Sequence, residues 1–322
     1  MKLVIQIPCL NEEASLPATF ADLPRSLPGV TTIEYLVIDD GSTDRTSEVA
    51  KELGVHRVVR FPARRGLARG FEAGLREALA MGADIIVNTD ADNQYQGQDI
   101  GKLIAPILER RADMVVGTRP IDNIEHFSPL KKSLQKLGSG VVRALSGSDV
   151  PDATSGFRAY SREAAMKLTV LTNFTYTLET IIQASQKNIT VAAVPIRTNG
   201  MLRESRLFKG MRAYITRSLG TMFRVYVLYQ PLRFFLTLAS LFGAGALVLF
   251  GRFFYLYFTT TGQTGHVQSV IVGGVLAMIA ALFAAFGVLA DLTAMNRRIL
   301  EEIVTNSRAL RYGTTRKEKE RS

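Results

Sequence analysis

Two aspartates and a glutamine stand at alternate positions directly after an apolar run. Asp90, Asp92 and Gln94 follow the residues Ile-Ile-Val at 85–87. Alternate positions of an extended segment offer their oxygen atoms to one hard cation. Mg²⁺ and Mn²⁺ prefer carboxylate, amide and phosphate oxygens and usually share their shell with substrate phosphates. These residues therefore predict a site for Mg²⁺ or Mn²⁺ that a diphosphate completes.

The sequence lacks the motifs of a zinc site, of dinucleotide binding and of an intramolecular disulfide. The chain has no CxxC pair, no HExxH and only 3 histidines, which argues against a zinc site. No GxGxxG follows the first expected strand, and the glycines at 66 and 70 have the wrong spacing for dinucleotide binding. The single cysteine, Cys9, excludes an intramolecular disulfide and is expected to be a small buried hydrophobic residue.

The elements that must position these residues follow an alternating pattern from residue 1 to about 205. Short runs rich in β-branched residues predict strands at 3–7, 35–38, 58–59, 85–87 and 114–116. Helix-length segments lie between them at 43–53, 67–80 and 98–111. This alternation predicts an α/β fold with a mainly parallel, Rossmann-like sheet covered by helices on both faces.

Polar residues follow four of the expected strands, at the edge where such sheets bind ligands. The four segments are 8–12 (Pro-Cys-Leu-Asn-Glu), 39–42 (Asp-Asp-Gly-Ser), 90–92 (Asp-Ala-Asp) and 117–119 (Gly-Thr-Arg). Taken alone, residues 40–44 could also be a turn followed by a helix N-cap. Four polar strand ends together predict one crevice.

The ordered set resembles family 2 glycosyltransferases of the GT-A fold. Residues 8–12 resemble the opening P-x-Y-N-E, with Leu10 in place of the tyrosine, and residues 39–42 and 90–94 resemble D-D-G-S and D-A-D-x-Q. Residues 152–160 are similar to the D-x-T-S-G-F-R-A-Y segment of the dolichol-phosphate mannose synthase branch, which includes bacterial polyprenyl-phosphate glycosyltransferases. The resemblance covers most of residues 1–206.

The resemblance implies a nucleotide sugar as donor. It assigns the metal ion and the diphosphate to Asp90, Asp92 and Gln94. The residues that it implies for nucleotide-sugar binding are Pro8, Leu10, Glu12, Asp39, Asp40, Asp90 and Arg206. Among these, Leu10 offers only an apolar contact where the family has an aromatic ring, and Arg206 resembles a basic residue that closes over the diphosphate.

The same resemblance implies polyprenyl phosphate as acceptor. Arg119 matches an arginine that faces the acceptor phosphate, and Lys131 and Gln135 stand where the branch has arginine and serine. A lipid phosphate is already anionic at neutral pH and needs no strong general base. Asp90, Asp92 and Arg119 are therefore the expected catalytic residues, for an in-line attack that inverts the anomeric carbon. The donor stays open between UDP- and GDP-sugars, and the acceptor between undecaprenyl and dolichyl phosphate.

The last third of the chain predicts a membrane hairpin. Residues 232–257 and 267–292 each reach the ~20 apolar residues that cross a bilayer core. The connection at 259–266 has no lysine or arginine, whereas both outer flanks carry several arginines. The positive-inside rule then places the catalytic domain and the C-terminus in the cytoplasm of a prokaryotic cell. The alternative is a buried helical hairpin of a soluble protein.

These observations divide the chain into four regions. They are a glycosyltransferase domain (1–206), an amphipathic region (207–230) that is interfacial or packs on the domain, two transmembrane helices (231–293) and a basic tail (294–322). The net charge of +10 suits anionic lipid better than nucleic acid, because the basic residues cluster beside apolar segments. Two spans make a thin membrane platform, which leaves room for a homo-oligomer.

Two alternative functions remain beside the polyprenyl-phosphate transferase. One is a processive polysaccharide synthase, but that group uses a Q-x-x-R-W segment and this chain has no tryptophan. The other is a membrane-anchored scaffold or transport accessory that keeps the fold without the activity. The intact Asp90, Asp92 and Gln94 argue against the second alternative.

Overall fold

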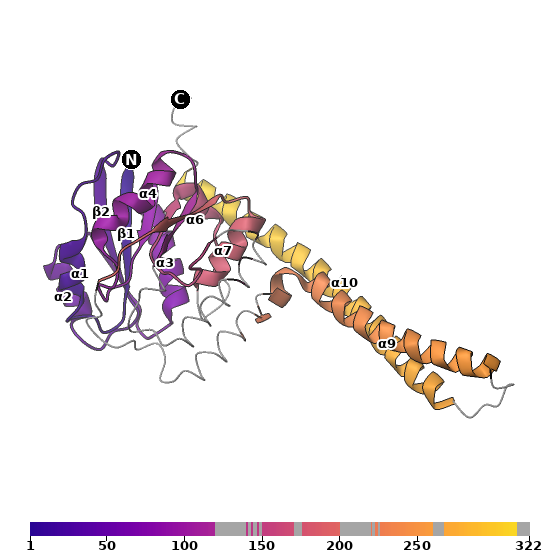
Figure 1. Cartoon of the computed structure of the whole chain (residues 1–322). Helices are drawn as coiled ribbons and strands as arrows, with labels where there is room; N and C mark the ends of the chain where they lie inside the picture. The colour runs from indigo at the N-terminus through magenta and orange to yellow at the C-terminus, as the bar shows by residue number, and fades with distance from the viewer. Residues whose placement is uncertain are drawn as a thin grey trace. The chain divides into compact units, whose positions relative to one another are not determined.

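The computed structural model describes residues 1–119, 150–170, 176–199, 226–259 and 267–313, and the single positions 140, 143, 147, 220, 223 and 224. The chain forms two compact units (Figure 1). Unit 1 comprises residues 1–222 and 302–322, and unit 2 comprises residues 223–301.

The described part of unit 1 contains a seven-stranded sheet in the order β3-β2-β1-β4-β6-β5-β7. The strands are β1 (Lys2–Cys9), β2 (Thr32–Asp39), β3 (Arg57–Arg60), β4 (Ile85–Asn88), β5 (Met114–Thr118), β6 (Arg158–Ser161) and β7 (Val191–Pro195). All neighbours are parallel except that β6 runs antiparallel to β4 and to β5. The carboxyl ends of β1, β2, β4 and β5 therefore lie along one edge, where β6 begins.

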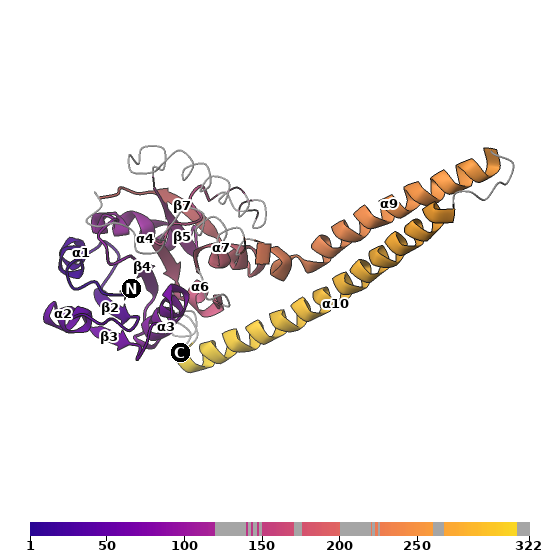
Figure 2. The same ribbon diagram turned by 90° about the horizontal axis from the view of Figure 1, so that it is seen from below.

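Helices cover both faces of this sheet (Figure 2). One face packs against α1 (Leu16–Asp22), α2 (Thr46–Glu52) and α4 (Ile100–Leu108), the last preceded by the short η1 (Gly97–Asp99). The other face packs against α3 (Leu67–Ala80), α6 (Arg162–Lys167) and α7 (Tyr176–Gln186). Because both faces are covered, the central strands are almost continuously apolar, and Leu3, Val4, Ile5 and Ile7 of β1 are fully buried.

The sequence predicted five of the seven strands, and all five are confirmed. The helix expected at 67–80 matches α3 residue for residue. The sequence did not predict β6 and β7. The apolar pattern does not indicate β6 because this strand starts with Arg158, which is fully buried. Its guanidinium donates to the carbonyl oxygens of Ser155, Ala153 and Thr177. A buried strand that begins with a charge breaks the apolar pattern used to find strands.

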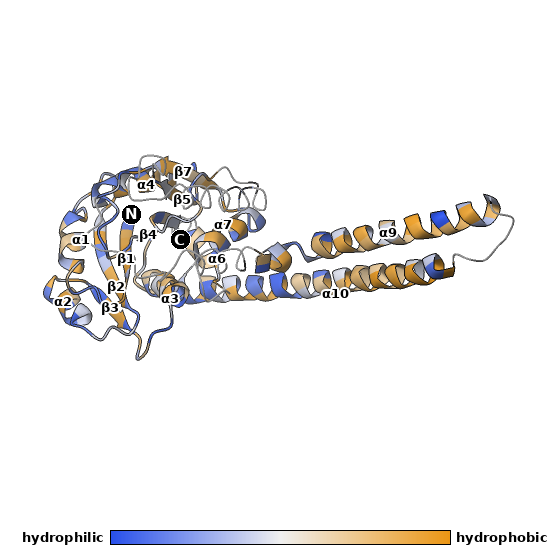
Figure 3. Cartoon of the chain, turned by 60° about the horizontal axis from the view of Figure 1, so that its bottom comes forward, coloured by the Kyte–Doolittle hydropathy of each residue, from blue (hydrophilic) through white to orange (hydrophobic). Residues whose placement is uncertain are grey.

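Unit 2 contains α9 (Pro231–Thr259) and the first part of α10 (Val267–Tyr312). Both helices are long and apolar enough to cross a membrane (Figure 3). Within this unit the guanidinium carbon of Arg297 lies 4.4 Å from the centre of the Tyr229 ring, a cation–π contact. Arg297 also pairs with Glu301 at 3.5 Å, one turn further along α10.

The last turns of α10 belong to unit 1 and pack on it. Arg308 donates to the carbonyl oxygens of Met166 at 3.1 Å and Leu168 at 2.5 Å, which end α6, and lies 3.8 Å from Glu72 of α3. Arg162 also donates to the carbonyl oxygen of Tyr312. The sequence predicts residues 294–322 as a basic tail, whereas helix α10 continues to Tyr312 and its end is part of unit 1.

Candidate active site

The chain turns sharply directly after β4. Asn93 has a φ of 56°, in the left-handed region that asparagine tolerates, and the backbone N–H of Gln94 donates to Asp92 Oδ1 at 3.2 Å. The sequence expected an extended segment here, with three side chains alternating along it. That expectation is wrong, because the motif is a turn closed by the side chain of Asp92. We call residues 90–94 the acidic turn.

Asp90 is the carboxylate of this turn that receives no hydrogen bond from any described residue. Burial and the charge of Asp92 raise its pKa, Arg119 opposes them, and Glu12 raises it further, with the result that its pKa is about 7. Glu12 follows β1, Asp90 follows β4 and Arg119 follows β5, so three strand ends at one edge of the sheet contribute to the electrostatics of Asp90. Positive charge added nearby stabilises the ionised form of a carboxylate whose pKa is raised in this way.

Arg119 at the end of β5 is held by the segment that leads into β6. Its Nε donates to Asp152 Oδ2 at 2.7 Å, and its Nη2 donates to Asp152 Oδ1 at 3.1 Å and to Thr154 Oγ1 at 3.0 Å. Asp152 is 1% exposed and the Arg119 side chain 12% exposed. Burial opposes both charges, but Arg119 lowers the pKa of Asp152, and Tyr95, Asp152 and Asp90 raise the pKa of Arg119. Both side chains therefore stay ionised at neutral pH.

A buried polar network supports the backbone behind Asp90. Gln6 Nε2 donates to Asn88 Oδ1 at 2.8 Å, and Asn88 Nδ2 donates to the carbonyl oxygen of Gly156 at 2.8 Å and to Tyr176 Oη at 2.9 Å. A Cβ at Gly156 would lie 3.1 Å from Asp90 Oδ2 and from Tyr176 Oη. Glycine at 156 thus lets this backbone approach the carboxylate.

The two aspartates that end β2 organise the neighbouring loops. Asp39 is fully buried, accepts from the backbone N–H of Ser42 at 2.7 Å and from Ser47 Oγ, and lies 3.5 Å from Arg60 Nε. Asp40 accepts from the backbone N–H groups of Arg65 and Gly66, at 2.7 and 2.9 Å. Asp40 therefore fixes the loop that precedes α3.

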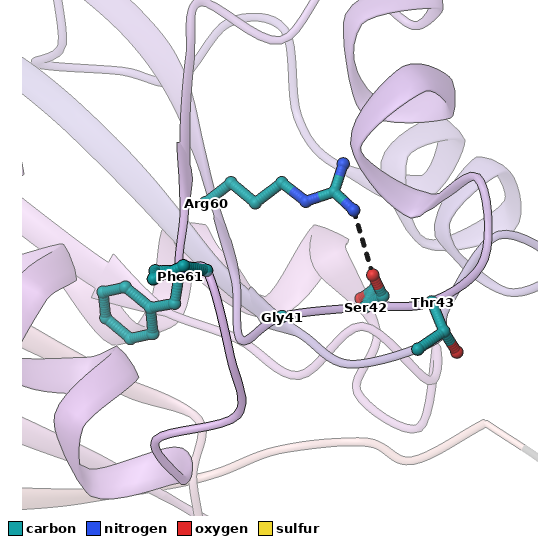
Figure 4. A pocket seen from close by; sticks show the side chains of 6 residues that line it. Gly41, Ser42, Thr43, Arg60 and Phe61 are labelled. Carbon is teal, nitrogen blue, oxygen red and sulfur yellow. Dashed lines mark hydrogen bonds between the residues drawn. The ribbon is translucent and has the colours of Figure 1, made fainter.

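A cavity of about 370 Å³ opens between the loops that follow β2 and β3 (Figure 4). Its walls are Gly41, Ser42, Thr43, Arg60, Phe61 and Pro62. Figure 4 shows the guanidinium of Arg60 turned to the Ser42 backbone, and its Nη2 donates to the Ser42 carbonyl oxygen at 3.0 Å. Gly41 has a φ of 75°, and a Cβ there would lie 2.7 Å from the carbonyl carbon of Ala63, so only glycine fits between the two loops.

The remaining predicted residues divide into two groups. Pro8 lies in β1 opposite Ile38, and Leu10 follows that strand; both are half-buried. Glu12 is 7% exposed and accepts from Ser15 Oγ, and burial raises the pKa of the Cys9 thiol, as expected of an inert buried cysteine. Lys131, Gln135 and Arg206 lie outside the described residues.

The acidic turn fits a divalent cation that a ligand helps to hold. Among the described residues there is no group of three acidic, histidine or cysteine side chains for a metal ion. Two carboxylates are nevertheless a usual protein contribution to a Mg²⁺ site completed by phosphates and water. Asp90 accepts no hydrogen bond from the described residues, and Asn93 Oδ1 is a buried oxygen without a partner. Acceptors left in this state suit a cation, which supplies positive charge without a proton.

Comparison with known proteins decides the family. The model of the family described as Glycosyl transferase family 2 matches residues 4–169, more than half of the chain. The chain belongs to glycosyl transferase family 2. The resemblance to family 2 is thereby confirmed, and the acidic turn, Arg119 and the cavity all lie within the matched residues. The chain is a glycosyltransferase, which sets aside the non-catalytic scaffold.

Three curated proteins are similar to this chain. A protein of Methanocaldococcus jannaschii whose name gives no activity is 35% identical over 202 residues, which cover 61% of this chain and 81% of that protein. The UDP-N-acetylglucosamine–dolichyl-phosphate N-acetylglucosaminyltransferase of Methanococcus voltae is 30% identical over 214 residues, 60% and 83% of the two chains. The undecaprenyl-phosphate mannosyltransferase of Micrococcus luteus is 32% identical over 167 residues, 50% and 66%.

A solved structure supports the fold. Glucosyl-3-phosphoglycerate synthase from Mycobacterium tuberculosis, crystallised with Mn²⁺, UDP and glucosyl-3-phosphoglycerate, superposes with a TM-score of 0.52 at 22% identity. The match covers 71% of this chain and 78% of that one. The expected GT-A fold, with its mixed sheet and covering helices, is confirmed.

Several residues of the site escaped the sequence reasoning. Arg60, Phe61 and Pro62 directly follow the run Val58-Val59, so the strand-end rule would have found them had it been applied to the third strand. Asp152 begins the motif at 152–160, and the motif by itself indicates no role for it. Its place opposite Arg119 arises only because β6 is inserted between β4 and β5.

Proposed function

We propose that this glycosyltransferase moves a sugar from a nucleotide sugar to polyprenyl phosphate at the cytoplasmic face of a prokaryotic membrane. The observation that carries the proposal is the placement of the acidic turn after β4 and of Arg119 after β5 at the same edge of the sheet, in a chain that also has two helices of membrane-spanning length. A carboxylate pair suits a cation and its diphosphate, and an arginine suits a phosphate acceptor. The names of the Methanococcus and Micrococcus relatives agree with a polyprenyl-phosphate acceptor.

On the donor side, the cavity between the loops after β2 and β3 suits the nucleoside. It lies beside Asp39, and its volume of about 370 Å³ is within the usual range of small-molecule sites. Asp90, Asp92 and Gln94 would hold Mg²⁺ or Mn²⁺ at the diphosphate. A cation held there would supply positive charge to the departing diphosphate. In the proposal, Pro8, Glu12 and Asp40 also bind the nucleotide sugar on this side.

On the acceptor side, Arg119 would bind the lipid phosphate. Asp152 holds its Nε and Nη2, which orients the guanidinium and leaves Nη1 to face a ligand. The phosphate oxygen is itself the nucleophile, so the protein needs to align it with the anomeric carbon rather than to remove a proton. Lys131 and Gln135 complete this side in the proposal.

The membrane assignment rests on α9 and α10. Both carry windows of high mean hydropathy, 2.1 and 2.5. The end of α10 packs within the catalytic unit, which supports the C-terminus and the catalytic fold being on the same side of the membrane. The positive flanks of the hairpin favour the cytoplasmic side.

One assay tests the proposal. Purified full-length protein is incubated with Mg²⁺ or Mn²⁺, undecaprenyl or dolichyl phosphate, and a panel of UDP- and GDP-sugars that includes mannose, glucose and N-acetylglucosamine. The expected product is a lipid-linked monosaccharide. An elongating polysaccharide would favour the processive synthase instead, and sugar transfer only to water-soluble acceptors would remove polyprenyl phosphate from the proposal. Asp92→Asn serves as the inactive control.

A further inference from the structure

Asn199, which follows β7, holds the acidic turn through two hydrogen bonds. Its backbone N–H donates to the carbonyl oxygen of Gln94 at 2.8 Å, and its side-chain Nδ2 donates to the carbonyl oxygen of Asn93 at 3.1 Å. One residue thus holds two consecutive carbonyl groups, including the one on the left-handed Asn93. Thr198 adds an antiparallel bridge to Tyr95, just beyond the turn.

Residues 196–199 are themselves anchored to the sheet. Ile196 continues from β7 and donates its N–H to the carbonyl oxygen of Thr118 at 3.0 Å. Arg197 donates to the fully buried Asp99 from its backbone N–H at 2.7 Å and from Nη2 at 2.8 Å. Residues 196–199 therefore connect the end of β5 to the acidic turn through hydrogen bonds.

We propose that Asn199 is a positioning residue for the cation, acting through its two hydrogen bonds to the acidic turn. This inference rests on the proposed function. Asp92 and Gln94 flank the residue whose carbonyl oxygen Asn199 binds, so a change in the Asn93–Gln94 backbone moves both of them. Residues that orient metal ligands affect metal affinity even though they do not touch the metal.

The side-chain chemistry makes the role specific. The amide of asparagine donates to Asn93 O, whereas an aspartate of the same shape has only acceptors and would face that carbonyl with a negative charge. Asn199→Asp should therefore open the turn. Asn199→Ala removes only the side-chain bond and keeps the backbone bond to Gln94, which makes it a milder variant that retains the fold if the aspartate variant does not.

The experiment measures Mn²⁺ affinity directly, by following the EPR signal of free Mn²⁺ in titrations with and without UDP or GDP. We expect Asn199→Asp to weaken Mn²⁺ binding about 10-fold. We expect Asn199→Ala to weaken it about 3-fold, the size of one lost neutral hydrogen bond. The matched control is Asn188→Asp, since Asn188 is exposed, has a φ of 52° and lies in the turn after α7. It should bind Mn²⁺ like the wild type.

A second readout separates positioning from a general loss of structure. Thermal unfolding of Asn199→Ala should stay close to that of the wild type, and saturating Mn²⁺ should restore most of its transfer rate. Unchanged Mn²⁺ affinity in both Asn199 variants, with an active wild type, would contradict the positioning role of Asn199 and leave the proposed function standing. A wild type that neither binds Mn²⁺ nor forms lipid-linked sugar would overturn both.

Discussion

Arg119 and Asp152 form a two-bond ion pair between the end of β5 and the segment that leads into β6. The two nitrogen–oxygen distances are 2.7 and 3.1 Å, and both side chains are largely removed from solvent. Such a pair fixes the plane of the guanidinium. The arginine proposed to meet the acceptor phosphate is thus oriented before any ligand arrives.

The first prediction concerns this pair. Asp152→Ala leaves the Arg119 charge buried without its partner, so the free energy of unfolding should fall by about 3–5 kcal/mol. Asp152→Asn keeps one acceptor oxygen and should lower the free energy of unfolding by less. Thermal or denaturant unfolding in detergent measures both. Glu52→Ala, which breaks the exposed pair of Glu52 with Arg45, is the control and should change little. Equal stability of Asp152→Ala and the wild type would contradict the prediction.

The pair also predicts a pH dependence. The folded pKa of Asp152 is lowered, first because Arg119 attracts its charge against the opposing effect of burial. Its stabilising contribution is therefore present above the unfolded pKa of about 3.9, and it is lost as the pH falls through the lower folded value. Unfolding measured between pH 6 and pH 3 should show a wild-type loss at the acid end that Asp152→Ala lacks.

Arg119 should affect the acceptor more than the donor. Arg119→Ala removes the guanidinium and should raise the apparent KM for lipid phosphate or lower kcat, while nucleotide-sugar affinity stays nearly constant. Arg119→Lys should rescue only partly, because an ammonium lacks the planar fork that Asp152 grips. Calorimetry of the donor and kinetics of the acceptor, on the same variants, test this. A large loss of donor binding with normal acceptor kinetics would assign Arg119 to the diphosphate.

Activity should depend on a divalent cation. Asp92→Asn removes a charge from the acidic turn while keeping an oxygen for the N–H of Gln94, so transfer should fall by about 100-fold or more with the fold intact. A chelator should abolish transfer, and added Mg²⁺ or Mn²⁺ should restore it. Full turnover in excess EDTA would rule out the cation. Circular dichroism of the variant confirms that the loss is not unfolding.

Replacing Gly156 with alanine should lower activity more than stability. A Cβ at this position would lie 3.1 Å from Asp90 Oδ2, so Gly156→Ala should displace the carboxylate by a few tenths of an ångström. We expect transfer to fall about 10-fold, and the free energy of unfolding by about 1 kcal/mol. Gly101→Ala in α4 is the matched control, because its Cβ would meet only Leu27 at 3.4 Å. Comparable kinetics of the two variants would contradict the role of Gly156.

The hairpin orientation is tested by labelling. A cysteine introduced as Thr261→Cys in a Cys9→Ser background should react with a membrane-impermeant thiol reagent added outside intact cells. Thr314→Cys should react only after the membrane is opened. The opposite pattern would reverse the orientation and remove the cytoplasmic donor. Cys9 is 3% exposed in the structure, so the wild type is a suitable unlabelled control.

Much of this fold could be predicted from the sequence, because the patterns that indicate strands and helices are local. Alternating apolar runs located the five predicted strands, and the helical period located α3 to the residue. The same local reasoning placed Asp90 and Arg119 at strand ends. It was wrong about the path of residues 90–94, because a turn closed by Asp92 and a left-handed Asn93 leaves no mark in an apolar pattern.

Residue types and their order, read from the sequence alone, determined the α/β class, the family motifs and the two membrane-length apolar segments. Only the tertiary structure decided that Asp152 grips Arg119, that Gly156 lies against Asp90 and that Asn199 clasps the acidic turn. These contacts join residues 33, 66 and 106 positions apart (152 − 119, 156 − 90 and 199 − 93). The insertion of the antiparallel β6 between β4 and β5, and the return of the chain through β7, bring them together. Such contacts depend on which strands pair across the sheet, and strand pairing is a property of the whole chain that a local pattern does not contain.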